Sequence, residues 1–127
     1  MGQQSSILCV DDEHTALFLR TRVLQKAGFE VVPVSSAAQA LDVINSRPVD
    51  LVLTDHLMPD VSGAELAREV KARRPHVPVV LLSGGNELPT EASCVDLFLS
   101  KLEGPAVLCE KISELVAKSQ KASIASS

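Results

Sequence analysis

Short apolar runs alternate along the chain with longer stretches of helical spacing, and this alternation limits the possible folds more than any other feature. The runs consist mainly of leucine and β-branched residues, as in VVLL at residues 79–82. Runs without polar alternation are typical of parallel strands, which are buried on both faces of their sheet. The sequence predicts five strands, at residues 7–10, 30–34, 51–54, 77–82 and 96–99.

The first helix is predicted between residues 16 and 27, where apolar residues recur at intervals of three and four. Gly28 follows and is a typical stop signal, because glycine readily adopts the backbone conformation that ends a helix. The predicted apolar face of this helix consists of Ala16, Leu19, Val23 and Ala27.

Serine residues mark the start of two further helices. Ser36 and Ser62 are each followed three residues later by glutamine or glutamate, which is the spacing of a capping box. A glycine–proline pair at residues 104–105 predicts the start of the last helix. The stretch 86–94 should hold the fourth helix, although Pro89 makes its signal poor. The apolar residues expected on these helices are Leu41 and Ile44, Leu66 and Val70, and Leu108, Ile112 and Leu115.

A strand followed by a helix, repeated five times, predicts a parallel sheet with helices on both faces. Pro33 lies within the second run and has no N–H to donate, so this strand should be at an edge of the sheet. The strand order 2-1-3-4-5 meets that condition and creates a ligand-binding crevice between strands 1 and 3. We therefore predict an α/β fold, a flavodoxin-like (βα)5 three-layer sandwich. Residues 5–118 form its single domain, and residues 1–4 and 119–127 are flexible termini.

Composition narrows the function classes. Aromatic residues make up 2% of the chain, with no Trp or Tyr, which argues against surfaces that stack nucleic-acid bases. The formal net charge of −4 also argues against direct nucleic-acid binding. No apolar run reaches the ~18 residues of a membrane span. Three cysteines without metal-ligand spacing are typical of free thiols in a reducing compartment, so we expect a cytoplasmic protein.

Polar residues follow the predicted strands at the points where the strands end. Asp11 and Asp12 follow the first strand, Asp55 the third, Ser83 the fourth and Lys101 the fifth. Because the carboxyl ends of parallel strands share one edge of a sheet, these side chains should meet in one crevice. Singly, each has an ordinary interpretation as a helix cap, a turn residue, a loop serine or a solvated lysine. Their joint occurrence favours a functional site.

Three carboxylates in one crevice resist full ionisation unless a cation joins them. A hard divalent ion removes this conflict, and Mg²⁺ suits a site of carboxylates, a backbone carbonyl and water. Such an ion, together with an ammonium and a hydroxyl group, neutralises the oxygens of a phosphoryl group in transfer. The sequence therefore predicts a phosphoryl-transfer site in which Asp55 is the nucleophile and forms an aspartyl phosphate.

Four motifs in this order resemble the response-regulator receiver domain of two-component signalling, of the chemotaxis-regulator type. They are DD at residues 11–12, DxxMPxxxG at 55–63, SG at 83–84 and DxFLxK at 96–101. The resemblance covers residues 5–118, nearly the whole chain. It implies the flavodoxin-like fold and a signalling switch in a phosphorelay, which promotes only its own phosphorylation and dephosphorylation and is not a turnover enzyme.

The resemblance also implies a role for each residue of the crevice. Asp55 would be the phosphoacceptor and, with the backbone carbonyl of Leu57, a ligand of Mg²⁺, for which Mn²⁺ could substitute. Asp12 would bind this metal directly, and Asp11 largely through water. Lys101 would pair with the acceptor carboxylate and then with the phosphoryl oxygens.

Further residues would turn phosphorylation into a signal. By the same resemblance, Ser83 would bond to the phosphoryl group and move toward it, and Phe98 would turn inward in response. Partner binding would then change on the face formed by segment 86–94, strand 96–99 and the last helix. The loop before the third helix would be shaped by Met58, Pro59 and Gly63.

The implied partners are a sensor histidine kinase or a histidine phosphotransfer protein, and a downstream effector protein. Direct binding to nucleic acid or membrane is not expected, and a homodimer is left open. Leu102 stands where the family usually has proline, and Gly84-Gly85 replaces larger residues. These departures keep an alternative open, a phosphorylation-independent interaction (scaffold) module on the same fold. An aspartyl-phosphate hydrolase is disfavoured because position 57 is not a second aspartate.

Overall fold

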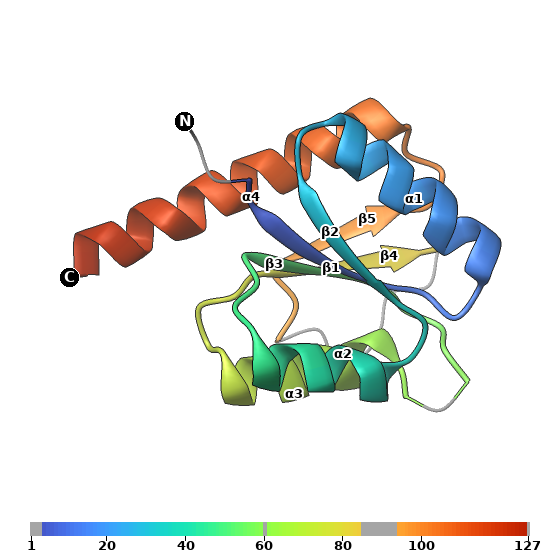
Figure 1. The fold of residues 1–127 in the computed structure, drawn as a ribbon, viewed down its shortest axis with the longest axis horizontal. Helices are drawn as coiled ribbons and strands as arrows, with labels where there is room; N and C mark the ends of the chain where they lie inside the picture. The colour runs from blue at the N-terminus through green and yellow to red at the C-terminus, as the bar shows by residue number, and fades with distance from the viewer. Residues whose placement is uncertain (1–3, 60, 85–93, 127) are drawn as a thin grey trace.

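The computed structural model describes residues 4–59, 61–84 and 94–126, with side chains as far as Ser119. These residues form a parallel five-stranded sheet in the order β2-β1-β3-β4-β5, as predicted (Figure 1). Strands β3, β4 and β5 each end one residue later than expected. The strands are β1 (Ser6–Val10), β2 (Glu30–Val34), β3 (Leu51–Asp55), β4 (Val79–Ser83) and β5 (Leu97–Ser100).

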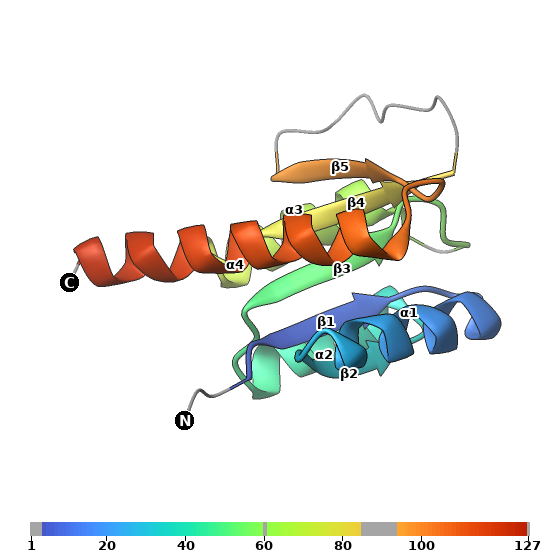
Figure 2. The same cartoon turned by 90° about the horizontal axis from the view of Figure 1, so that it is seen from above.

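Helices cover both faces of this sheet and complete the predicted three-layer sandwich. One face carries α1 (His14–Lys26) and α4 (Pro105–Ser126), and the other carries α2 (Ala37–Ser46) and α3 (Gly63–Arg73) (Figures 1 and 2). The fourth helix was predicted at residues 86–94, of which residues 86–93 lie outside the described residues. The described residues contain four helices.

Each strand divides its side chains between two apolar clusters, because successive residues of a strand point to opposite faces. In β1, Ile7 and Cys9 belong to the cluster that includes Leu24 of α1, whereas Leu8 and Val10 belong to the cluster on the other face. All four residues are fully buried. This two-sided burial explains why the predicted strands lack polar alternation.

Pro33 lies in β2, at the edge of the sheet, as predicted. It pairs in register with Cys9 of β1, which is the neighbour of β2. The far side of β2 has no strand partner among the described residues, so the missing N–H of Pro33 leaves no gap in a strand ladder.

Both predicted capping serines begin helices. The Oγ of Ser36 accepts a hydrogen bond from the backbone N–H of Gln39 at 3.2 Å, and that of Ser62 accepts one from Glu65 at 3.1 Å. These bonds satisfy N–H groups that have no partner inside the first helical turn. Of the predicted apolar residues, Ile44, Leu66, Val70 and Ile112 are fully buried, and Leu41, Leu108 and Leu115 are partly buried.

The predicted apolar face of α1 was wrong, although the helix itself and the stop at Gly28 (φ 100°) were right. Thr21 and Leu24 are the buried residues of α1, whereas Leu19 is 58% exposed. The buried stripe includes a polar residue, Thr21, and a search for apolar periodicity therefore passes over it. Three residues of the predicted face, Ala16, Leu19 and Val23, line a cleft between α1 and the start of α4.

The sequence predicts a flexible terminus at residues 119–127, and the backbone of residues 119–126 is helical. Helix α4 continues to Ser126 and projects beyond the sheet (Figures 1 and 2). Residues 119–126 contain no glycine or proline to end the helix, and alanine, lysine and glutamine favour its continuation. The hydroxyl of Ser119 also donates a hydrogen bond to the carbonyl of His76 at 3.1 Å, which ties this part of α4 to the loop before β4.

Candidate functional site

Three carboxylates meet at the carboxyl ends of β1 and β3. Asp55 is the last residue of β3, and Asp11 and Asp12 follow directly after β1. These strands are hydrogen-bonded neighbours, with Val10 paired to Thr54. One oxygen from each aspartate lies within 4.8 Å of the corresponding oxygens of the other two. The crevice that the strand order predicts between strands 1 and 3 is therefore lined by three acidic side chains.

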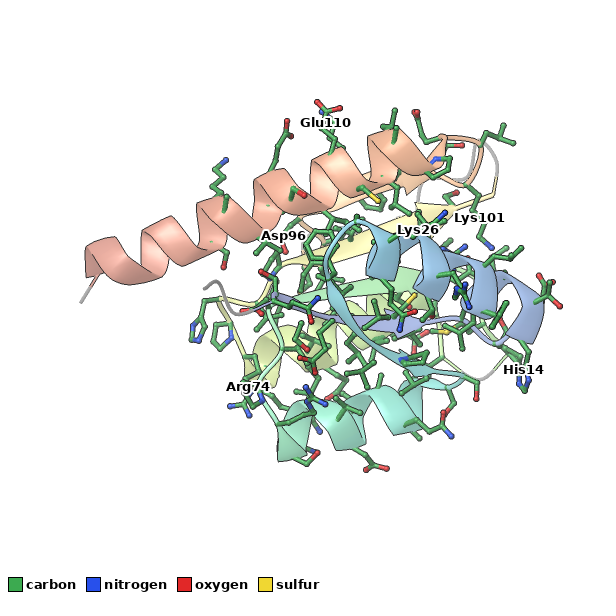
Figure 3. The ribbon with its side chains drawn as sticks, turned by 45° about the horizontal axis from the view of Figure 1, so that its top comes forward. His14, Lys26, Arg74, Asp96, Lys101 and Glu110 are labelled. Carbon is green, nitrogen blue, oxygen red and sulfur yellow. The ribbon has the colours of Figure 1, made fainter. Side chains whose placement is uncertain are left out.

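Lys101 reaches this cluster from the end of β5. Its Nζ lies 2.8 Å from Oδ1 of Asp55, whose side chain is 8% exposed. The backbone N–H of Lys101 donates to the carbonyl of Ser83 at 2.8 Å. This hydrogen bond holds the residue that follows β5 against the end of β4. Figure 3 shows Lys101 at the same end of the sheet as His14, the first residue of α1. The side chain of Lys101 is one-third exposed, so it is accessible to a ligand that enters the crevice.

Asp11 is held by two donors from the protein itself. Its Oδ1 accepts the backbone N–H of Glu13 at 2.9 Å, and its Oδ2 pairs with Nη1 of Arg20 at 2.8 Å. The side chains of Asp11 and Arg20 are 1% and 13% exposed. We did not predict Arg20 as a site residue. No local signal in the sequence distinguishes it from the exposed Arg22 of the same helix.

Asp12 differs from the other two aspartates. Its residue is exposed, and among the described residues it has no ion-pair or hydrogen-bond partner. Each buried carboxylate thus has its own cation, while the exposed one is open to a ligand. This donor set of clustered carboxylate oxygens fits a hard divalent cation such as Mg²⁺.

Ser83 and Phe98 lie on the strands next to the cluster. Ser83 is the buried last residue of β4, in register with Ser100, while Leu82 before it is in register with Asp55. Phe98 is partly buried in β5 and is in register with Leu81. The structure therefore places the Ser83 backbone one residue beyond the level of Asp55, on the neighbouring strand.

Gly63 is required by the packing behind Asp55. A Cβ atom at this position would overlap the Leu81 side chain and lie 2.5 Å from the backbone carbonyl oxygen of Asp55. The N–H of Gly63 also donates to the carbonyl of His56 at 2.8 Å, which closes the loop. Of the other loop residues, Met58 packs against the core below α2 and α3, Pro59 is exposed, and the Leu57 side chain is 61% exposed.

A cleft of about 270 Å³ adjoins the acidic cluster between α1 and the start of α4. Both cations of the cluster, Arg20 and Lys101, line it together with Glu103. Its apolar wall contains Ala16, Leu19 and Val23 of α1 and Leu82, Leu99, Pro105 and Leu108. The stripe of α1 that the sequence assigned to the core thus borders the functional crevice.

The three cysteines are free thiols, as predicted. Burial raises the pKa of the Cys9 thiol to about 11, although the nearby Arg20 guanidinium acts in the opposite direction. Burial also raises the pKa of the Cys109 thiol. Because the thiolate is the reactive form, Cys9 is an inert core residue at neutral pH.

Comparison with known proteins identifies the family. The sequence profile described as response regulator receiver domain matches residues 7–113. The chain belongs to this family. The family predicted from the four motifs is thereby confirmed, and the match falls inside the predicted domain of residues 5–118.

Named relatives of this receiver domain include plant and bacterial response regulators. It is 34% identical over 88 residues to the two-component response regulator ORR5 of Oryza sativa subsp. japonica, covering 67% of this chain and 66% of that protein. It is 31% identical over 117 residues to the transcriptional regulatory protein GlrR of Escherichia coli (strain K12), covering 89% of this chain and 26% of that protein. The receiver domain thus spans slightly less than two thirds of the first relative and about a quarter of the second.

Solved receiver domains have the same fold. A CheY-like response regulator receiver domain protein from Methanospirillum hungatei JF-1 superposes with a TM-score of 0.87 at 27% identity, covering 94% of this chain and 99% of the other. The response regulator TrrA from Thermotoga maritima, solved in complex with Mg²⁺ and BeF, gives a TM-score of 0.83 at 29% identity, covering 88% and 99%. Receiver domains bind Mg²⁺ at an acidic pocket, and the cluster of Asp11, Asp12 and Asp55 forms such a pocket. No helix among the described residues is long and apolar enough to cross a membrane.

Proposed function

We propose that this receiver domain accepts a phosphoryl group from a phosphohistidine onto Asp55, with Mg²⁺, and that phosphorylation switches its binding to a partner. The observation that carries the proposal is the convergence at one sheet edge. Three carboxylates lie within 4.8 Å of one another, and Lys101 forms an ion pair with Asp55. A single aspartate at the end of a strand would be interpreted as a turn residue. Three carboxylates together with a lysine support phosphoryl transfer.

The residues around Asp55 have different roles in the proposed phosphoryl transfer. Lys101 occupies Oδ1, so Oδ2 of Asp55 is the oxygen that attacks phosphorus. The new O–P bond forms as the bond from phosphorus to the donor imidazole nitrogen breaks, and the donor leaves as histidine. Lys101 and the hydroxyl of Ser83 then bind phosphoryl oxygens. Because Lys101 is already held in place, it stabilises the developing charge with little reorganisation.

The metal would be held mainly by Asp12, the open carboxylate, with Asp55 and the backbone carbonyl of Leu57 as further ligands. Asp11, whose oxygens already accept protein hydrogen bonds, would contribute through water. When bound, Mg²⁺, or Mn²⁺ in its place, supplies neutralising charge to the transferring phosphoryl oxygens. Met58, Pro59 and Gly63 would maintain the loop that presents the Leu57 carbonyl.

The switch would run through β4 and β5. Movement of Ser83 toward the phosphoryl group would be transmitted to β5, because the Ser83 carbonyl accepts the N–H of Lys101. Phe98 is partly buried in β5 and would turn further inward. Partner binding would then change on the face formed by segment 86–94, β5 and α4. The domain would catalyse only its own phosphorylation and dephosphorylation.

A protein phosphodonor fits the surroundings of the site. Four large apolar side chains are more than half exposed on α1 and on the segments after β3 and β5, namely Phe18, Leu19, Leu57 and Leu102. Apolar surface of this kind suits contact with a protein. We assign this role to a sensor histidine kinase or a histidine phosphotransfer protein, with an effector protein downstream. We propose that residues 5–118 act in the cytoplasm and bind neither nucleic acid nor membrane directly.

The test is phosphorylation by acetyl phosphate and Mg²⁺, followed by intact-protein mass spectrometry. Wild type should gain one phosphate, and Asp55→Asn should gain none. Addition of EDTA should abolish labelling of wild type. Asp42→Asn is a matched control, because Asp42 is an exposed aspartate on α2 that does not belong to the cluster, and it should be labelled like wild type. Equal labelling of wild type and Asp55→Asn would overturn the proposal. Partner affinity that is identical with and without phosphodonor would instead indicate the scaffold alternative.

A further inference from the structure

Arg20 is an additional cation of the acidic cluster, and the phosphoryl-transfer steps above do not use it. Its guanidinium pairs with Asp11 at 2.8 Å, and both side chains are nearly buried, at 13% and 1% exposure. A surface ion pair contributes little, but removal of one partner from a buried pair leaves an uncompensated charge. Arg20 is therefore fixed beside the cluster before any metal binds.

The presence of Arg20 changes the charge that an incoming cation meets. The three carboxylates of the cluster carry a formal charge of −3, and Lys101 alone would reduce it to −2. Arg20 reduces it further, to −1. The attraction between the cluster and a divalent cation falls accordingly, because the Coulomb energy scales with the product of the charges.

The geometry assigns different parts to the two neighbouring aspartates. Both oxygens of Asp11 already accept hydrogen bonds, from Arg20 and from the backbone of Glu13. A cation that approaches Asp11 thus competes with the guanidinium, whereas Asp12 is open. The cleft between α1 and α4, which Arg20 lines and which also contains Glu103, gives the guanidinium a space into which it can withdraw.

We propose that Arg20 is a positioning residue of the metal site, a built-in counter-ion that holds Asp11 in place and keeps the affinity for divalent cations low. The inference rests on the proposed function, because it concerns the same metal site. The proposal predicts that removal of Arg20 increases the affinity for Mg²⁺, because Arg20 competes with the metal for Asp11. If Arg20 only supported the fold of the site, its removal would decrease this affinity.

The test is Mg²⁺ binding by isothermal titration calorimetry, without phosphodonor, at fixed pH and ionic strength. Arg20→Gln should bind Mg²⁺ about tenfold more tightly than wild type, the order expected for one unit charge removed at a few ångströms in a partly solvated site. Arg20→Lys keeps the charge and should remain close to wild type. Arg22→Gln is the matched control, since Arg22 is an exposed arginine of the same helix that lies over the Phe18 ring at 5.9 Å. It should leave the affinity unchanged.

A second variant covers the case in which Arg20→Gln fails to fold. Asp11→Asn combined with Arg20→Gln removes both charges of the pair, and its Mg²⁺ affinity is compared with that of Asp11→Asn alone, so that both proteins lack the Asp11 carboxylate. The double variant should bind Mg²⁺ about tenfold more tightly than Asp11→Asn, because one positive charge fewer opposes the cation. Unchanged or weaker binding by folded Arg20→Gln would overturn the role of Arg20 and leave the proposed function intact. A double variant that binds Mg²⁺ no more tightly than Asp11→Asn would also overturn it. Absence of Mg²⁺ binding by wild type would overturn the metal site itself.

Discussion

Aspartates lie at both ends of the sheet, and the two ends use them differently. At the amino-terminal ends of the strands, Asp50 accepts the backbone N–H of Ser6 at 2.7 Å, and Asp96 accepts that of Val79 at 2.7 Å. Asp96 also pairs with Lys71 at 2.8 Å. At the carboxyl-terminal ends, three aspartates converge within 4.8 Å. Asp96 precedes β5 and Lys101 follows it, and Figure 3 shows the two residues toward opposite ends of the sheet.

The difference lies in what surrounds each carboxylate. Asp50 and Asp96 do not belong to the acidic cluster. Each accepts a hydrogen bond from an N–H group at the start of a neighbouring strand, so we assign both to the stability of the fold. Of the converging aspartates, Asp11 and Asp55 are nearly buried and are balanced by cations, while Asp12 is left open. Such an arrangement costs desolvation energy and is a weak source of stability. It is, however, well suited to binding a cation and a phosphoryl group.

The largest stability effect is expected where packing supports the site. Gly63→Ala places a methyl group against the Leu81 side chain and the Asp55 carbonyl oxygen, and the backbone atom cannot yield easily. We predict a loss of about 1–3 kcal/mol in the free energy of unfolding, together with slower phosphorylation. Urea denaturation and phosphate labelling measure the two effects. Gly104→Ala is the control, because nothing lies within 4 Å of the added atom; a similar effect there would refute the packing explanation.

A smaller effect, on stability alone, is expected at the opposite end of the sheet. Asp96→Ala leaves the Val79 N–H and the Lys71 ammonium without their carboxylate partner. The Asp96 side chain is 37% exposed, so we predict a loss of about 1–2 kcal/mol in urea denaturation. Labelling of the folded variant by acetyl phosphate should match wild type. If Asp96→Ala lost labelling without losing stability, the assignment of stability to one end of the sheet and of phosphorylation to the other would be contradicted.

The smallest effect is expected at an exposed ion pair away from both ends. Glu69 and Arg73 on α3 are 2.6 Å apart, with side chains that are 53% and 37% exposed. Because solvent screens such a pair, Glu69→Gln should cost about 0.3–0.5 kcal/mol in urea denaturation and nothing in labelling. A loss comparable to that of Asp96→Ala would show that surface charge, rather than strand-end hydrogen bonding, determines the stability of this domain.

Sequence patterns were sufficient to predict the fold and the meeting of the acidic side chains. Pro33 identified an edge strand, and the strand order that follows from it makes strands 1 and 3 neighbours. Once those strands are adjacent, Asp11, Asp12 and Asp55 have to share one edge of the sheet. These inferences depend on backbone topology alone, which short-range periodicity encodes well.

Side-chain pairing between elements was not predictable in the same way. Arg20 reaches Asp11 through a long side chain, and nothing in the local pattern distinguishes it from the exposed Arg22 two residues later. Thr21 lies in the buried stripe of α1 because the sheet and the neighbouring helix determine which side is covered, whatever the polarity of one residue. The continuation of α4 past residue 118 depends partly on the Ser119 contact with His76, which joins residues far apart in the sequence.

The most direct test of the central claim is to identify which carboxylate of the cluster receives the phosphate. Wild-type protein is treated with acetyl phosphate and Mg²⁺ and then with sodium borohydride, which reduces an aspartyl phosphate to homoserine. Peptide mass spectrometry then locates the reduced residue. We predict homoserine at position 55 only, with Asp11, Asp12 and Asp96 unmodified. Homoserine at position 11 or 12, or at no position of the cluster, would contradict the assignment of Asp55 as the phosphoacceptor.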